Sequence, residues 1–402
     1  GPQAWWTFQS TTPSGLAWVL AVAVALATAL IAGLSRHRGA FALAWLGSLL
    51  AATFVAVTGN VSVGQDHDWA TDAAIAISLA VVPLASAAVG ILLAARVVPE
   101  ATSVAAVGRY HRLVPPAVVL AGCAHALIAW QQLAGRSPLE VFYGLPTVGL
   151  ALCLALLVVS WGWRQASGCA RLSADPRRAL ASVTRDVVVL VAYVAFLVAA
   201  NHTPSPRFLV PQTIQTNYLG YEVDVPATLE RLIGLGRPNL LWVLLSVGAV
   251  LAYVWGVVLV HRQGGRWPLQ NLLAWLAGWG LTLYLAVSGL WMYSTAVFSW
   301  HMLVHMTVNM LVPILCVLGA PFSLIGAASR ARPDGASPGP REVLEAVSGY
   351  RPLQRLLSPP VLWVNYVASL FVVYFTPLFP WLMKYHWAHQ LMLLYFMVTG
   401  FA

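Results

Sequence analysis

The sequence predicts an all-α integral membrane protein, a polytopic helical bundle of about eleven transmembrane helices in two modules. Of its 402 residues, 59% are hydrophobic and only 9% are charged, and the mean hydropathy is +0.76. Inside lipid, only helices and closed barrels satisfy every backbone polar group. The apolar runs of this chain are continuous, whereas barrel strands alternate apolar and polar residues. We therefore expect helices, with the lipid bilayer as their first partner.

Each predicted span comes close to the ~20 apolar residues that a helix needs to cross a bilayer. The chain stops at Ala402 inside the last apolar run, so we expect the natural protein to continue. The expected spans are residues 13–34, 40–58, 73–95, 113–131, 143–163, 186–201, 239–260, 270–291, 300–320, 360–380 and 387–402.

The connections between these spans differ in charge. Seventeen of the twenty-two Lys and Arg residues fall in alternate connections, including 164–185 and 326–358. The positive-inside rule places those connections in the cytoplasm. The first residues of the chain and the segment 202–238 then lie outside, as in a multi-pass protein of a bacterial plasma membrane. Because topology accounts for the net charge of +9, we expect no nucleic-acid partner.

Two long connections divide the chain. We expect a first membrane module at 1–205, an outside linker at 206–238 and a second membrane module at 239–402. The linker contains scattered prolines, and Val225 to Leu235 can form a short interfacial helix. The cytoplasmic loop 326–358 is rich in Pro, Gly and Arg, with a short helix expected around Glu342 to Val347.

The strongest functional signal is the sequence HMLVHMTVNM, from His301 to Met310. Steps of four residues stay on one face of a helix, so His301, His305 and Asn309 form one stripe. The methionines at 302, 306 and 310 form a second stripe beside it. Imidazole and thioether together suit Cu(I), and polar groups at membrane depth are usually functional. The alternative is that these side chains only pack the bundle.

The last span repeats this chemistry. It begins at the same predicted outer face with His386 and His389, and it continues to Met392. All seven methionines of the chain lie from Met292 onward, whereas methionines that merely fill gaps would be spread over all spans. We therefore predict that His301 or His305 faces His389 across a cleft open to the outside.

Other polar residues give weaker signals. For His125, inside the fourth span, a structural role is favoured over a metal ligand. One acidic outside stretch is expected to be a solvated loop rather than a cation site: Asp66, His67, Asp68 and Asp72. Loop positions among cytoplasmic arginines are expected for three histidines: His37, His111 and His261. With no methionine and no helically spaced histidine pair, residues 1–200 are expected to bind metal weakly or not at all.

The segment AVFSWHMLVHMTVNMLVPILCVLGAPFSL resembles the hallmark of the CtaG-type cytochrome c oxidase assembly factors, with its HMxxHM start, its proline and its Leu-Gly-small-Pro ending. The stretch HWAHQLMLLYFMVTG resembles the second histidine-bearing helix of that family, although Tyr395 stands where relatives often carry a histidine. The resemblance covers roughly 239–402. It implies copper handling and copper supply to the copper B centre of the oxidase.

The first half is similar, more loosely, to the CopD family of copper-resistance membrane proteins. The similarity lies in TDAAIAISLAVVPLASAAVG, YHRLVPPAVVLAGCAHAL, LEVFYGLPTVGLALCLALLVVSWGWRQ and NHTPSP. A CopD-like module followed by a CtaG-like module resembles fused proteins of high-GC Gram-positive bacteria.

From these features we predict a copper-handling membrane protein, not an enzyme, that supplies Cu(I) at the outer face to a cytochrome c oxidase subunit or another copper chaperone. Two alternatives stay open: a b-type haem electron carrier with His305 and His389 as axial ligands, and a metal-free scaffold of a respiratory complex. The predicted copper ligands are His301, Met302, His305, Met306, Met310, His386, His389 and Met392.

Overall fold

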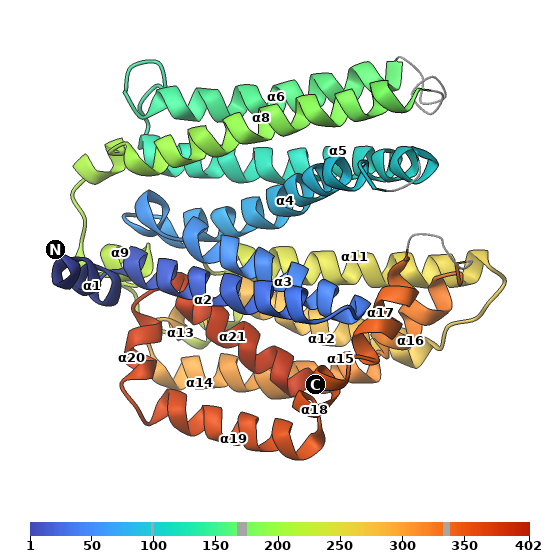
Figure 1. The fold of residues 1–402 in the computed structure, drawn as a ribbon. Helices are drawn as coiled ribbons and strands as arrows, with labels where there is room; N and C mark the ends of the chain where they lie inside the picture. The colour runs from blue at the N-terminus through green and yellow to red at the C-terminus, as the bar shows by residue number, and fades with distance from the viewer. Residues whose placement is uncertain (98–99, 167–174, 333–337) are drawn as a thin grey trace. The chain divides into compact units, whose positions relative to one another are not determined.

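The computed structural model describes residues 1–97, 100–166, 175–332 and 338–402, and it confirms an all-α membrane protein (Figure 1). Within these residues there is no β-strand, and one isolated antiparallel bridge pairs Leu235 with Ser288. Eight of the described helices are long and apolar enough to cross a membrane: Ser14–Leu34, Arg38–Ala56, His67–Ala94, Val104–Leu133, Gly144–Ala166, Pro176–Leu209, Leu240–Arg262 and Phe298–Ala328.

The other three predicted spans are also helical, but they are shorter or less apolar. They correspond to α12 (Leu269–Val287), α19 (Pro359–Tyr374) and α21 (His386–Phe401). With 16 residues each, α19 and α21 rise about 24 Å, less than the ~30 Å hydrocarbon core. Cys169 and Arg171, in the predicted loop 164–185, lie outside the described residues.

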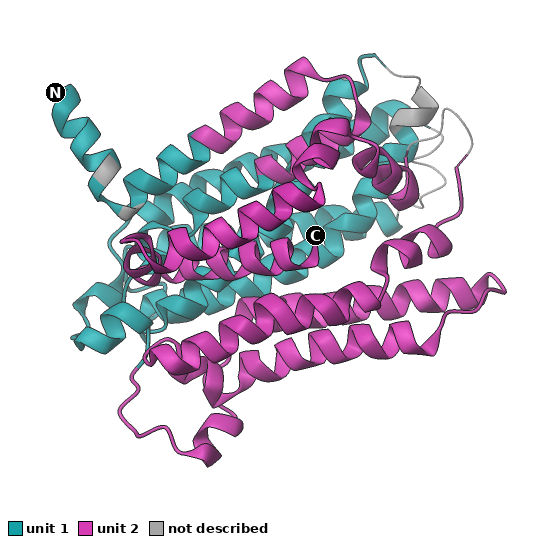
Figure 2. Cartoon of the chain, turned by 90° about the horizontal axis from the view of Figure 1, so that it is seen from below, with its two compact units in different colours: residues 1–22, 49–221 teal, residues 23–48, 222–402 magenta. Residues whose placement is uncertain are grey.

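The chain forms two compact units (Figure 2). Unit 1 comprises residues 1–22 and 49–221, and unit 2 comprises residues 23–48 and 222–402. The change at residue 221 falls within the predicted linker, and residues 23–48 join the second unit by their contacts.

In unit 1, α4 packs along α5, and α6 packs along α8 (Figure 1). Proline at 83, 115 and 116 lies inside α4 and α5 without ending either helix. The elements of unit 1 are α1 (Pro2–Thr11), the start of α2 (Pro13–Leu34), the end of α3 (Arg38–Ala56), η1 (Gly59–Ser62), α4 (His67–Ala94), α5 (Glu100–Leu133), α6 (Gly144–Ala166), α8 (Pro176–His202), η2 (Pro206–Leu209) and α9 (Ile214–Leu219).

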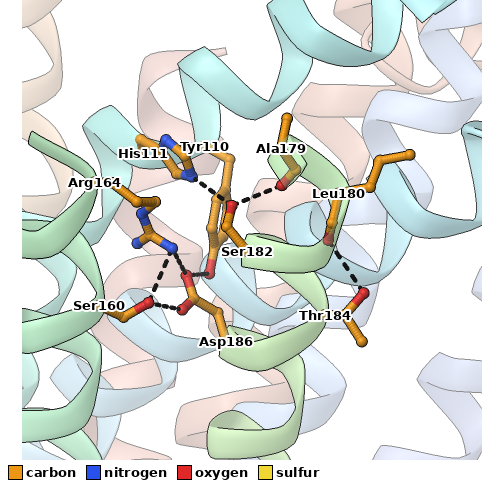
Figure 3. A network of polar contacts seen from close by, with 9 residues as sticks. All are labelled: Tyr110, His111, Ser160, Arg164, Ala179, Leu180, Ser182, Thr184 and Asp186. Atoms are coloured by element: carbon orange, nitrogen blue, oxygen red, sulfur yellow. Dashed lines mark hydrogen bonds and ion pairs between the residues drawn. The ribbon is translucent and has the colours of Figure 1, made fainter. Parts of the chain in front are cut away.

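A buried ion pair joins α5, α6 and α8 (Figure 3). Arg164 Nη1 lies 2.9 Å from Asp186 Oδ2, and both side chains are fully buried. Tyr110 donates its hydroxyl to Asp186 Oδ2 at 3.0 Å, and Ser160 donates to Oδ1 at 2.8 Å. Arg164 was predicted to lie in a cytoplasmic loop, and this is wrong. It lies in the last turn of α6 because a carboxylate on α8 compensates its charge.

Two further loop predictions are corrected in unit 1. His111 lies within α5 and is buried, with Nε2 3.5 Å from the Ser182 hydroxyl. The stretch from Asp66 to Asp72 is also buried and begins α4 instead of forming a solvated loop. The turn after α9 covers it, since the Asp66 N–H donates to the carbonyl of Gly220 at 2.7 Å. At that glycine, a Cβ atom would lie 2.5 Å from Asp68 Oδ1.

In unit 2, α11 packs on α12, α12 on α15, and α15 on α21. The apolar core between them includes Trp242, Leu285, Val308 and Leu393. The elements are α10 (Leu229–Ile233), α11 (Leu240–Arg262), α12, α13 (Gly289–Ser294), α14 (Phe298–Met306), η3 (Thr307–Leu311), α15 (Val312–Leu318), α16 (Pro321–Ala328), α17 (Pro340–Ser348), α18 (Arg351–Leu356), α19, α20 (Leu378–Met383) and α21.

The two short helices predicted in the connections are confirmed. Helix α10 lies within the predicted segment Val225 to Leu235, and α17 covers Glu342 to Val347. At the start of α17, the Glu342 carboxylate accepts backbone N–H groups from Arg332 and Gly339. These hydrogen bonds lower the pKa of Glu342 below its ordinary value.

The predicted span 300–320 is interrupted by the π-helical turn η3, between α14 and α15. Pro313 has no N–H, so the carbonyl of Asn309, four residues earlier, loses its helical donor. Gly400 on α21 lies against this carbonyl, because a Cβ atom at that position would be 2.4 Å from Asn309 O. The extra residue in the turn therefore lies where α14 meets α21, and π-turns are frequent at functional sites.

Candidate metal centre

Three buried histidines converge in unit 2. His301 and His305 come from α14, and His389 comes from α21. One ring nitrogen of each lies within 4.8 Å of the others, and the side chains are 1%, 0% and 5% exposed. His305 Nε2 lies 2.8 Å from His389 Nε2. The predicted approach of these two helices is confirmed, but the rings are enclosed rather than set in an open cleft.

Helical spacing and ring stacking set this geometry. Because His301 and His305 are four residues apart on α14, their rings stack at 3.8 Å between centroids, with 27° between planes. His389 stands at the start of α21, and its ring centroid lies 5.3 Å from that of His301 and 5.1 Å from that of His305. The three imidazoles thus form one compact group.

The hydrogen-bonding capacity of this group is not met by protein atoms. Between the two Nε2 atoms that lie 2.8 Å apart, only one proton can sit. Neither ring nitrogen of His301 has a hydrogen-bond partner among the described residues. Buried polar groups normally have partners, and neutral imidazole is the commonest protein ligand for metals. The donor set therefore fits a metal cation.

Aromatic side chains enclose the three rings. Phe298 stacks on His301 at 6.0 Å, and Phe379 meets the same ring edge-on at 5.2 Å. The Tyr374 hydroxyl of α19 lies 3.3 Å from His305 Nδ1. That contact fixes the ring orientation of His305 and leaves Nε2 to face His389. Outer contacts of this kind orient metal-binding histidines.

The other predicted ligands lie outside this group of three histidines. Met302 and Met306 are half-buried on the adjacent stripe of α14, and Met310 is 51% exposed. Met392 is buried in an apolar cluster with neighbours from α19 and α21. His386 is half-buried, with Nε2 3.0 Å from Gln390 Nε2. A metal-binding role for these five residues stays a prediction.

Sequence analysis missed several polar neighbours of the site. Tyr374 closes an apolar span, which is an ordinary place for tyrosine at a membrane interface. Gln390 accepts from Trp242 Nε1 at 2.6 Å and so links α11 to α21. Asn309 was assigned to the histidine stripe but given no role. Its side chain is buried, and neither amide atom has a partner among the described residues.

All three histidines lie in a region that matches a known family. Residues 251–402 match the model of the cytochrome c oxidase caa3 assembly factor family (Caa3_CtaG). This match confirms the CtaG resemblance for the second half of the chain. The CopD resemblance of the first half stays a prediction.

Similar proteins occur in mycobacteria. The chain is 32% identical over 397 residues to an uncharacterized protein of Mycobacterium leprae, covering 98% of this chain and 57% of the relative. It is 32% identical over 391 residues to uncharacterized proteins of Mycobacterium bovis and Mycobacterium tuberculosis, covering 96% of this chain and 56% of each relative. The chain thus spans little more than half the length of these relatives. No solved structure matches.

Proposed function

We propose that this membrane protein binds Cu(I) between His301, His305 and His389 and serves in cytochrome c oxidase assembly. The observation that carries the proposal is a buried group of three converging imidazoles, in which neither ring nitrogen of His301 has a hydrogen-bond partner among the described residues. It lies within the residues that match the assembly-factor family. Copper is the cargo in this proposal rather than a catalytic group.

The chemistry of the site favours Cu(I) as that cargo. Imidazole suits copper and zinc, but zinc takes four ligands, and a zinc site with three histidines completes them with water. The aromatic enclosure excludes water, which favours a monovalent ion over a divalent one because burial of charge is costly. No thiolate is part of the group, so the ion is held without the closed sulfur site that would trap it.

The route of the ion follows from the predicted topology. The distribution of basic residues places the starts of α14 and α21 at the outer face of the plasma membrane. His386, half-buried one turn before His389, is the first residue that an arriving ion would meet. From the group of three histidines the ion would pass to an oxidase subunit or another copper chaperone.

A b-type haem requires a different spacing of the two histidine nitrogens. Two imidazoles bound to one iron from opposite faces place their nitrogens about 4 Å apart, twice the usual metal–nitrogen distance. His305 Nε2 and His389 Nε2 lie 2.8 Å apart, and His301 stacks directly on His305. This crowding favours a small ion over haem. A Soret band in purified protein would instead support the haem alternative.

A Cu(I) titration of the purified full chain against a competing chromophoric chelator tests the proposal. We expect one tightly bound Cu(I) per chain, lost in His305→Ala and retained in His261→Ala. The control residue is an exposed histidine in the last turn of α11. Equal Cu(I) binding by both variants would contradict the proposal.

A further inference from the structure

Unit 1 contains a cavity that the copper proposal does not use. Its volume is about 360 Å³, within the ~300–1,000 Å³ of small-molecule sites. Residues of α4, α5, α6 and α8 line it, together with parts of α2 and α3 that belong to the same unit. The family match at 251–402 does not extend to any of these residues.

The walls of this cavity are apolar, and a few polar groups are placed among them. Val55, Ile77, Ile128 and Leu150 are typical of the lining. The lining also includes His125 of α5, whose Nε2 is hydrogen-bonded to the Tyr193 hydroxyl of α8. An apolar body with a few fixed polar contacts is the usual composition of a ligand site.

A second tyrosine leaves a donor free in the cavity. Tyr143 lines it and is only 4% exposed. Its hydroxyl has no hydrogen-bond partner among the described residues, and only its backbone carbonyl is engaged, by Thr147. A tyrosine hydroxyl is a hydrogen-bond donor, so it would favour an occupant of this cavity that supplies an acceptor.

We propose that the cavity binds a membrane-soluble small molecule with an apolar body and a carbonyl-type oxygen head, the chemistry of an alkylated quinone. A plain acyl chain would fill the apolar walls but leave the Tyr143 hydroxyl unpaired. A bound water would need two to four polar partners, and the wall is mostly apolar. A metal is disfavoured because the one cluster of metal-binding type found among the described residues is the group of three histidines in unit 2.

The full chain in nanodiscs, titrated with a decyl-substituted benzoquinone, tests this proposal. We expect saturable binding and a raised melting temperature, since a ligand that binds only the folded state stabilises it. Decylbenzene, which has the same tail without oxygens, should bind about three- to tenfold more weakly, the range that one lost hydrogen bond gives.

Variants of the cavity separate recognition from partition into the nanodisc. Ala129→Phe fills the cavity and should abolish saturable binding, while Tyr143→Phe should weaken it about three- to tenfold. Tyr218→Phe, at an exposed tyrosine of α9, should change nothing. An unchanged melting temperature without ligand would show that each variant is folded. Absent saturable binding, equal affinity for decylbenzene, or full affinity in Ala129→Phe would each overturn the proposal.

Discussion

The chain holds two buried polar clusters that are built in opposite ways. In unit 1, Asp186 accepts from Arg164, Tyr110 and Ser160, so its charge is matched by opposite charge and by hydrogen-bond donors (Figure 3). In unit 2, three like side chains meet, and His305 and His389 direct nitrogens at each other. The first cluster pairs its opposite charges internally, although Arg164 Nε and Nη2 have no hydrogen-bond partner among the described residues, whereas the second presents lone pairs that a cation would satisfy.

The contrast separates structural from functional polarity in a membrane protein. Both clusters lie on apolar helices, so burial alone does not distinguish them. The difference lies in charge complementarity: the first cluster pairs a guanidinium with a carboxylate, whereas the second brings together only imidazoles. A set of lone pairs without donors is costly in the apo protein and useful only when an ion arrives. Substitutions in the two clusters should therefore differ in their effects on stability and on Cu(I) affinity.

The largest effect is expected for Asp186→Ala. It leaves Arg164 buried with its charge uncompensated, which costs about 3–5 kcal/mol. A matched control is Glu345→Ala, which breaks an ion pair with Arg341 whose side chains are 61% and 43% exposed; that change should cost far less, because exposed ion pairs contribute little to stability. Melting temperature in one detergent measures both. Equal shifts would show that the buried pair is not a structural element.

For the histidine cluster we expect a large loss of Cu(I) affinity and a smaller loss of stability. His305→Ala should lower Cu(I) affinity by more than the ~10- to 100-fold seen for outer contacts of metal ligands. It should lower the melting temperature of the apo protein less than Asp186→Ala does, because the groups that lose a partner, the Tyr374 hydroxyl and His389 Nε2, are not left as an unpaired buried charge. Chelator competition and thermal unfolding of the same sample measure the two quantities. A large loss of apo stability would mean that the cluster is a packing element.

Tyr374→Phe should have an intermediate effect. Loss of the hydroxyl contact to His305 Nδ1 frees the ring to turn, which should weaken Cu(I) binding about tenfold. Tyr366→Phe, on the same helix but with its ring edge-on to Phe396, serves as the control. A tenfold loss in the control as well would place the effect in helix packing instead.

The smallest effect is expected for His386→Ala. Its Nε2 faces Gln390 rather than the three histidines. Equilibrium Cu(I) affinity should therefore fall by less than about threefold, no more than the loss of one neutral hydrogen bond would cause. The rate of Cu(I) loading should fall instead if this histidine receives the ion first. A loss of affinity as large as that of His389→Ala would restore His386 to the ligand set.

Much of the fold followed from composition and charge. Apolar runs and the alternation of basic residues predicted the helices, and the spacing of His301 and His305 predicted a shared face. The approach of His389 followed from both helices beginning at one face. What the sequence could not indicate was pairing across helices: Arg164 looks like a loop residue until Asp186 is found beside it.

Helical periodicity in the sequence could not predict the details of the site either. Steps of four residues predicted continuous histidine and methionine stripes, but the π-turn at Thr307–Leu311 breaks that periodicity just after His305. Gly400 of α21 lies against the Asn309 carbonyl of this turn, and that tertiary contact could not be predicted from the sequence. Methionine clustering suggested thioether ligands, yet Met392 packs in an apolar cluster and Met310 is half exposed.

X-ray absorption spectroscopy of the Cu(I)-loaded full chain identifies the atoms that bind the ion. Three imidazole ligands predict a first shell of nitrogen atoms at about 2.0 Å with the outer scattering of imidazole rings, and no sulfur shell. In His305→Ala that signal should disappear. A shell dominated by sulfur at about 2.3 Å, or a nitrogen shell that survives the substitution, would contradict copper binding between His301, His305 and His389.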